Sequence, residues 1–332
     1  MEKTLSIIIP TYNVSRYIVG TLKGLLSQDC DDFVVYIVDD CSKDDTVSLI
    51  RQHFAAELSS GKIDLALLDE NSGSAVARQH ALERVTTPFV TFLDADDNYS
   101  SSHAVATMCE AVKAEEADFY MFGYFTYHGR VKLKKQERLP HLMSAREAMI
   151  RKICGGHPIW NYLWNKVYRM SVVRDHNVTF VASERRAQEV RFNEDFLPKA
   201  RNVCYINKLL YVYNCTNPGS ISKRKSSVPF GREQFLARWQ RINEQYYRLM
   251  SNASALGCAE ECENPLRRSF CSMMVSSLAQ IEDVAVRKGV EEEIASSKLY
   301  VAMRPLMRKE RIRLVWKGFT GSLRNAAKKL LK

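Results

Sequence analysis

The chain has 332 residues, of which 46% are hydrophobic and 26% are charged. This composition is typical of a globular protein and excludes a disordered or a fibrous one. The length is sufficient for one full α/β domain and a smaller second unit. We expect no signal peptide and no transmembrane helix, because Pro10 interrupts the apolar start and the longest plausible uncharged stretch, 269–281, falls short of about 20 residues.

The positive charge is concentrated at the C-terminal end. The formal net charge is +10, and residues 304–332 contain ten Lys or Arg and the single acid Glu310, so this segment carries +9 and the rest of the chain about +1. A nearly neutral body does not favour binding to nucleic acid. The nine cysteines include no CxxC pair, which indicates reduced thiols in a cytosolic protein rather than a disulfide framework or a zinc site.

The first 125 residues alternate between two hydrophobic patterns. Short segments rich in β-branched and aromatic residues predict strands at 5–9, 33–38, 63–68, 89–93 and 119–125. The segments between them place apolar residues at helical spacing, and a capping sequence at 42–45 precedes one of them. Alternating strands and helices with short links predict an α/β domain with a mostly parallel sheet that is covered on both faces.

Residues with functional side chains follow the predicted strands. The carboxyl ends of parallel strands meet at one edge of the sheet, where ligands bind. The residues expected at this edge are Pro10 and Tyr12 after the first strand, Asp39 and Asp40 after the second, and Asp94, Asp96 and Asp97 after the fourth. The sequence therefore predicts a crevice that combines an aromatic ring with two acidic clusters.

Each acidic cluster is open to two interpretations. Three carboxylates within four residues repel one another, and a Mg²⁺ or Mn²⁺ ion shared with substrate phosphates would stabilise them. The alternative is a solvated turn that caps the next helix. In the same way, Asp39 and Asp40 could accept hydrogen bonds from a nucleoside or could cap a helix, and Tyr12 could stack on a base or simply pack.

These segments together form a recognisable pattern. SIIIPTYNVSRYI, FVVYIVDDCSKDDT, ENSGSAVARQHAL and FVTFLDADD follow one another up to residue 97, and WNKVYR, NEDFLPK and NPGSIS come further on. Their order and spacing resemble glycosyltransferase family 2 over about residues 4–225. The resemblance implies the GT-A fold, a nucleotide-diphosphate-sugar donor and a divalent metal ion.

The resemblance also implies roles for individual residues. Those expected at the nucleotide are Pro10, Tyr12, Asp39, Asp40 and Arg78. Those expected at the metal, which would be Mn²⁺ or Mg²⁺, are Asp96 as the direct ligand, Asp94, its partner in the DxD motif of the family, and Asp97 as a second candidate ligand. The segment 180–192, which contains ERRAQEVR, is left without a role.

Transfer of a sugar also needs a base, because an acceptor hydroxyl has a pKa far above 7. The resemblance assigns this role to Asp195, with Glu194 as the alternative; otherwise the pair caps a helix that begins near Phe196. Lys166 is expected to contact the diphosphate, or else to neutralise a neighbouring carboxylate. A near match to the Gln-x-x-Arg-Trp motif of processive synthases, at 234–239, has one residue too many, which favours transfer of a single sugar.

Three regions are expected along the chain. A GT-A catalytic domain covers 1–228, with a nucleotide-sugar half at about 1–125 and an acceptor half at about 126–228; a helical region follows at 229–303, and a basic amphipathic tail at 304–332. From Ile312 onward the apolar residues of the tail, Trp316 and Phe319 among them, form a helical stripe. We expect this tail to bind an anionic membrane surface, or else to pack on the catalytic domain.

The sequence thus predicts an inverting, metal-dependent glycosyltransferase on the cytoplasmic face of the cell membrane. It would move one hexosyl or N-acetylhexosaminyl group from a nucleotide sugar, with UDP as the expected nucleotide, to a cell-surface polysaccharide or a lipid-linked glycan precursor. One alternative is a nucleotide-sugar-binding or scaffold protein of the same fold that has lost turnover. A sugar nucleotidyltransferase ranks lower, because such enzymes carry a Gly-rich loop after the first strand, where this chain has Pro10 to Asn13.

Overall fold

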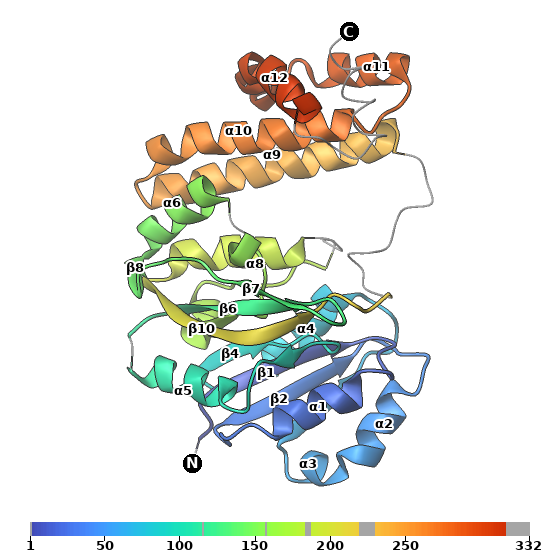
Figure 1. Ribbon diagram of the computed structural model, residues 1–332, viewed down its shortest axis with the longest axis vertical. Helices are drawn as coiled ribbons and strands as arrows, with labels where there is room; N and C mark the ends of the chain where they lie inside the picture. The colour runs from blue at the N-terminus through green and yellow to red at the C-terminus, as the bar shows by residue number, and fades with distance from the viewer. Residues whose placement is uncertain (1, 115, 157, 183–186, 219–229, 317–332) are drawn as a thin grey trace. The chain divides into compact units, whose positions relative to one another are not determined.

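The computed structural model describes the chain except for residues 1, 115, 157, 183–186, 219–229 and 317–332 (Figure 1). The described residues divide into two compact units. Unit 1 comprises residues 1–149 and 157–220, and unit 2 comprises 150–156 and 221–332. Unit 1 falls within residues 1–228, whereas residues 150–156 belong to the helical unit.

Unit 1 is built on one mixed sheet. Its strands are β1 (Leu5–Thr11), β2 (Phe33–Asp39), β3 (Ile63–Leu67), β4 (Phe89–Phe92), β5 (Asn98–Tyr99), β6 (Phe119–Tyr127), β7 (Lys132–Lys135), β8 (Leu142–Ser144), β9 (Lys166–Arg169) and β10 (Asn202–Asn214). Their order is β3-β2-β1-β4-β9-β6-β10-β5, with β7 beside β6 and β8 beside β10. The five strands predicted from the sequence are all present, as β1, β2, β3, β4 and β6.

Helices connect and flank these strands. They are α1 (Ile18–Leu26), α2 (Thr46–His53), α3 (Ala55–Ser59), α4 (Ser74–Arg84), α5 (Ala104–Ala114), α6 (Ala145–Gly155), α7 (Met170–Asp175) and α8 (Gln188–Phe196), of which α6 continues into unit 2. Strand β1 is buried from Leu5 to Ile9, as expected of a strand covered on both faces. The predicted α/β domain, a sheet with helices between and beside its strands, is confirmed.

The strand order departs from a purely parallel sheet at β9. β1, β2, β3 and β4 are parallel to one another, but β9 pairs antiparallel with both β4 and β6. This strand comes from the WNKVYR segment, which the periodicity analysis did not identify as a strand. It joins the parallel strands β1 to β4 to the part of the sheet built around β6 and β10.

Strand β10 carries an irregularity that matters for the site. It runs parallel to β6, and its register shifts between Ile206 and Leu209 and again between Leu209 and Tyr211. Beyond these shifts the ring of Tyr211 is fully buried and stacks on Trp164, with 4.4 Å between ring centroids and 9° between planes. Trp164 and Tyr211 thus form part of the core of unit 1.

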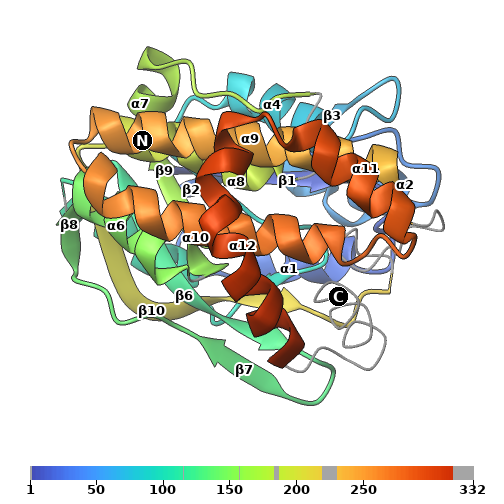
Figure 2. The ribbon, with the colours of Figure 1, turned by 90° about the horizontal axis from the view of Figure 1, so that it is seen from above.

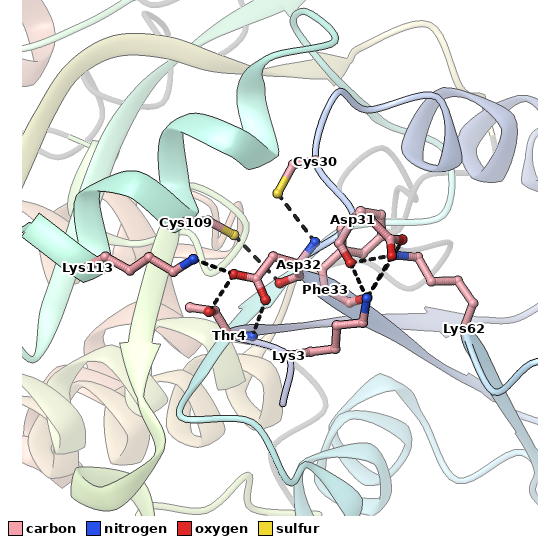
Figure 3. Close-up of polar contacts among 9 residues, drawn as sticks. All are labelled: Lys3, Thr4, Cys30, Asp31, Asp32, Phe33, Lys62, Cys109 and Lys113. Atoms are coloured by element: carbon pink, nitrogen blue, oxygen red, sulfur yellow. Dashed lines mark hydrogen bonds and ion pairs between the residues drawn. The ribbon is translucent and has the colours of Figure 1, made fainter. Parts of the chain in front are cut away.

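Charged residues join the amino ends of β1 and β2, at the edge opposite the predicted crevice (Figure 3). Asp31 accepts hydrogen bonds from Lys3 Nζ at 2.7 Å and Lys62 Nζ at 2.6 Å. Asp32 accepts from Lys113 Nζ at 2.6 Å. The hydrogen bonds from Lys3 and Lys62 lower the pKa of Asp31 to about 2. Because Asp31 is largely exposed, water screens these pairs and they contribute little to stability.

A less exposed ionic cluster joins three strands of unit 1. Asp118, just before β6, is almost fully buried. Its carboxylate accepts from Arg169 Nε at 2.8 Å and from the backbone N–H of Arg201 at 2.9 Å, at the ends of β9 and β10. Burial alone would raise the pKa of Asp118, but the hydrogen bonds from Arg201 and the charges of both arginines outweigh burial and lower it.

Replacing Asp118 by Asn is expected to destabilise the protein by about 3 kcal/mol, because it leaves Arg169 half-buried without its anion. Since the folded pKa of Asp118 is lowered, its contribution is complete above the unfolded pKa and is lost as the pH falls through the folded value. Urea unfolding at several pH values measures both effects. The matched control is Asp64→Asn at the exposed Asp64–Arg84 pair, expected to cost under about 1 kcal/mol. Equal unfolding midpoints for the two variants would contradict the assignment.

Unit 2 is helical, as predicted for the C-terminal region. Its long helices are α9 (Arg232–Ala255), α10 (Ala259–Leu278), α11 (Val284–Ile294) and α12 (Lys298–Trp316). α10 packs against both α9 and α12, and Figure 2 shows α12 crossing α10. α12 continues without a break through residue 304, where the basic tail was expected to begin, and residues 317–332 of that tail lie outside the described residues. None of the helices among the described residues has the length and hydropathy needed to cross a membrane.

Candidate active site

The carboxyl ends of β1, β2 and β4 lie side by side. Thr11 is opposite Asp39 in the β1–β2 pairing, and Ile8 is opposite Phe92 in the β1–β4 pairing. This register brings the residues that follow these strands to one edge of the sheet, as the sequence analysis expected. Tyr12 is exposed there, with 39% of its surface accessible, so its ring is free to face a ligand. Pro10 is half-buried at the end of β1.

The carboxylates of Asp39 and Asp40 are both buried and both shape loops. Asp39 accepts from Thr11 Oγ1 at 2.9 Å and from the backbone N–H of Ser42 at 2.8 Å. Asp40 accepts from the backbone N–H groups of Ser72 at 2.7 Å and Gly73 at 2.9 Å. Burial raises the pKa of Asp40 in spite of these two hydrogen bonds. Both residues therefore hold the loops that follow β2 and precede α4 in this structure.

The three carboxylates after β4 differ in burial: Asp97 is buried, whereas Asp94 and Asp96 are partly exposed. Asp97 is completely buried, and its two oxygens accept from Tyr211 OH at 2.8 Å and from the backbone N–H of Asn214 at 2.6 Å. Burial, with the nearby charges of Asp94 and Asp96, raises the pKa of Asp97 well above its ordinary value. Asp97 thus holds the loop against β10 and directs neither oxygen to the crevice.

Asp94 and Asp96 remain partly exposed at the edge of the sheet. Asp96 Oδ2 accepts from Asn217 Nδ2 at 2.6 Å, and Asp94 Oδ1 accepts from Arg78 Nη2 at 2.9 Å. Burial raises the pKa of Asp96, and the charge of Asp94 adds to this effect. Two carboxylates that disfavour each other's charge suit a divalent cation.

At this edge, two carboxylates rather than three are available to bind a metal ion. No group of three or more His, Cys, Asp or Glu side chains arranged to hold a metal occurs in the part of the chain that the structure describes. The reason is the position of Asp97, whose oxygens are engaged by β10. Mg²⁺ is commonly held by one or two carboxylates together with substrate phosphates and water, so Asp94 and Asp96 remain a suitable pair.

Arg78 connects this edge to helix α8. It lies on α4, is almost fully buried, and its Nη2 reaches Asp94 at 2.9 Å and Glu189 Oε1 at 3.4 Å. Glu189 belongs to the segment that the sequence analysis left without a role. Burial raises its pKa, an effect that Arg78 opposes and Asp94 reinforces. Glu189 lies four residues before Asn193, and this local spacing did not predict its contact with Arg78. The contact depends on the approach of α4, which carries Arg78.

Two buried polar atoms beside this contact have no hydrogen-bond partner among the residues that the structure describes. They are Arg78 Nε and Gln188 Oε1, both buried. Gln188 also donates from Nε2 to Ser74 Oγ at 2.7 Å, so its side chain spans from α8 to the start of α4. Buried polar atoms without partners are costly, so these two atoms are candidates for hydrogen bonds to a ligand.

The remaining predicted residues lie on or behind α8. Asp195 is partly exposed, and its Oδ2 accepts from Arg191 Nε at 3.3 Å, one turn earlier on the helix. Glu194, the alternative base, is buried. Lys166 is completely buried, and its ammonium donates to the carbonyl of Ile159 at 2.9 Å and to Asn165 Oδ1 at 2.7 Å. In this structure Lys166 thus supports the backbone behind the crevice rather than facing a diphosphate.

The sequence matches the family described as Glycosyl transferase family 2 over residues 6–176, which is just over half of the chain. The chain belongs to this family. A curated relative from Bacillus subtilis (strain 168), described as putative teichuronic acid biosynthesis glycosyltransferase TuaG, is 42% identical over 95 residues, which cover 29% of this chain and 36% of that protein. The chain thus spans about a third of the length of this relative.

Solved structures support the fold. The crystal structure of S. aureus TarS 1-349 in complex with UDP-GlcNAc superposes with a TM-score of 0.59 at 19% identity, covering 93% of this chain and 92% of that one. A mannosyltransferase, PcManGT from Pyrobaculum calidifontis in complex with GDP-Man and Mn²⁺, gives a TM-score of 0.53 at 15% identity, covering 100% of this chain and 87% of that one. At these identities the similarity establishes the architecture.

Proposed function

We propose that the protein is an inverting, metal-dependent glycosyltransferase that moves one sugar from a nucleotide-diphosphate sugar to a hydroxyl of a glycan. The observation that carries this proposal is the edge of the sheet at which Tyr12, Asp40, Arg78, Asp94 and Asp96 gather in a chain of family 2. UDP is the proposed nucleotide, and the UDP-GlcNAc in the TarS complex supports it.

The donor would lie along this edge. Tyr12 is exposed and offers a ring on which a base can stack, while the loops fixed by Asp39 and Asp40 form the walls of the nucleoside site. Asp94 and Asp96 would hold Mn²⁺ or Mg²⁺, as the Mn²⁺ in the mannosyltransferase complex supports. Such an ion, when bound, offsets the charge that develops on the departing diphosphate.

The acceptor hydroxyl must lose its proton as it attacks the anomeric carbon. Asp195 is the proposed base, because it matches the family position, is partly exposed and carries a carboxylate that can take this proton. Attack from the side opposite the diphosphate breaks the bond from the anomeric carbon to the phosphate oxygen and inverts the configuration. Glu189, also on α8, lies 3.4 Å from Arg78 Nη2, which also contacts Asp94, so Glu189 is a second candidate carboxylate.

A screen of nucleotide sugars tests the activity. The full-length protein, with Mn²⁺, is incubated with UDP-, GDP- and dTDP-linked hexoses and N-acetylhexosamines, and the released nucleoside diphosphate is measured. We expect release from a UDP-sugar, stimulated by Mn²⁺ and abolished by EDTA. Tight binding of a nucleotide sugar without release from any donor would support the alternative of a binding or scaffold protein that has lost turnover.

The proposed acceptor is a cell-surface polysaccharide or a lipid-linked glycan precursor. The name of the relative from B. subtilis, which refers to teichuronic acid biosynthesis, supports a polymer of the cell surface. The charge of +9 on residues 304–332 supports a peripheral position on an anionic membrane, where such precursors are assembled. Sedimentation of the protein with phosphatidylglycerol vesicles tests this position at the membrane.

A further inference from the structure

A second concentration of polar side chains lies in unit 2, on the helices that follow the catalytic domain. A pocket of about 400 Å³ opens there, within the size range of small-molecule sites. Its lining residues are Arg238, Arg268, Ser269, Ser272, Met273, Ser276 and Arg313. Three arginines and three serines therefore meet around one hollow, and none of the described residues that line it is acidic.

The local structure explains why these side chains converge. Ser269, Ser272 and Ser276 follow one another at intervals of three and four residues on α10, so they share one face of that helix. α9 and α12 pack on either side of α10, and they contribute Arg238 and Arg313. The pocket is thus a product of the packing of three helices within unit 2.

The electrostatics of the pocket favour an anion. Arg238 is half-buried, and it makes no ion pair with any residue that the structure describes. Burial lowers the pKa of Arg238, and the charge of the neighbouring Arg241 lowers it further. The positive charge of Arg313 is partly compensated, because its Nη1 lies 3.3 Å from Glu310 Oε1. The pocket therefore holds more positive charge than the surrounding carboxylates balance.

We propose that this pocket binds the phosphate group of a phosphorylated sugar or polyol, at a site separate from the proposed nucleotide-sugar crevice. Arginine guanidinium groups match the oxygens of a phosphate with paired N–H donors. Serine hydroxyls provide further donors at the same place. A charged membrane surface would need basic residues but no hollow, so a hollow lined by serines as well as arginines favours a ligand that enters the pocket.

The experiment is a calorimetric titration of the full-length protein, once with inorganic phosphate and once with glycerol 3-phosphate. Divalent cations are removed with EDTA, because the acidic crevice repels phosphate in their absence. We expect saturable binding with one site per chain, tighter for glycerol 3-phosphate. Arg268→Gln, at an exposed position, is expected to weaken binding at least tenfold, and Arg238→Gln is expected to do the same.

The matched control is Arg308→Gln, an exposed arginine of α12 that does not line the pocket, for which we expect binding within about twofold of the unchanged protein. Equal weakening in Arg308→Gln and Arg268→Gln would overturn the proposal, since it would indicate attraction by net charge alone. A second arm measures sedimentation with phosphatidylglycerol vesicles. Binding to vesicles without binding to either soluble phosphate would also overturn it, in favour of a membrane surface.

This proposal and the proposed glycosyltransferase activity can fail independently. Affinity for UDP in the presence of Mn²⁺ is measured on the Arg268→Gln variant and is expected to be unchanged. Loss of phosphate binding together with loss of UDP binding would overturn the assignment of two separate sites.

Discussion

Replacement of Asp195 by Asn is expected to lower the rate of sugar transfer by about three orders of magnitude while leaving the affinity for UDP within about twofold. Asn has the shape of Asp but cannot accept the proton of the acceptor hydroxyl. Asp195 is partly exposed on α8, and its hydrogen bond to Arg191 is long, at 3.3 Å, so the substitution should be tolerated by the fold. Single-turnover transfer and UDP calorimetry measure the two effects separately.

Two further variants test which carboxylate on α8 acts as the base. Glu189→Gln removes the acid that Arg78 ties to Asp94, and Glu194→Gln removes the buried neighbour of Asp195. If transfer collapses in Glu189→Gln and persists in Asp195→Asn, the base is Glu189 and the assignment of Asp195 is wrong. Asp175→Asn, at an exposed aspartate at the end of α7, is the matched control and should transfer at the unchanged rate.

The second large effect is expected at Asp96. Asp96→Asn should abolish the stimulation of UDP binding by Mn²⁺ and lower turnover by about two to three orders of magnitude, because the ion loses a carboxylate ligand. Asp94→Asn is expected to act in the same direction, and it also removes the partner of Arg78. Electron paramagnetic resonance of free Mn²⁺ in the presence of UDP measures the loss of the ion directly.

Asp97→Asn is expected to affect stability rather than metal binding, in contrast to Asp96→Asn. Because both oxygens of Asp97 accept hydrogen bonds from β10, this variant should lose thermal stability but keep the stimulation of UDP binding by Mn²⁺. Retention of Mn²⁺ binding in Asp96→Asn together with its loss in Asp97→Asn would reverse the assignment of the two residues.

The sequence was most informative where local pattern determines structure. Strands β1 to β4 are short apolar runs, and their parallel order follows from the helices between them, so the edge that collects Tyr12, Asp40 and Asp94 could be located in advance. The helical C-terminal region could likewise be predicted from its periodicity. These features depend on residues a few positions apart, which a single sequence displays directly.

The parts that escaped prediction depend on residues distant in the chain. Asp97 and Asp96 are adjacent, and the approach of Tyr211 and Asn214, more than 100 residues later, separates a buried anchor from a partly exposed acid. Glu189 has no distinguishing neighbours in the sequence, and it reaches the site because α4 carries Arg78 to it. Lys166 stands in a family motif, yet backbone carbonyls enclose its ammonium. No local pattern encodes such contacts.

The register shifts in β10 have a consequence for protein engineering. Tyr211 and Asn214 hold Asp97, and the shifts just before Tyr211 set which face of the sheet its ring occupies. A slip of one residue would turn Tyr211 to the other face and release the loop that bears Asp94 and Asp96. The part of unit 1 that contains β10 therefore cannot be exchanged for that of another family member as an independent module. A chimaera has to preserve the length between Ile206 and Tyr211, or it will lose the acidic edge formed by Asp94 and Asp96.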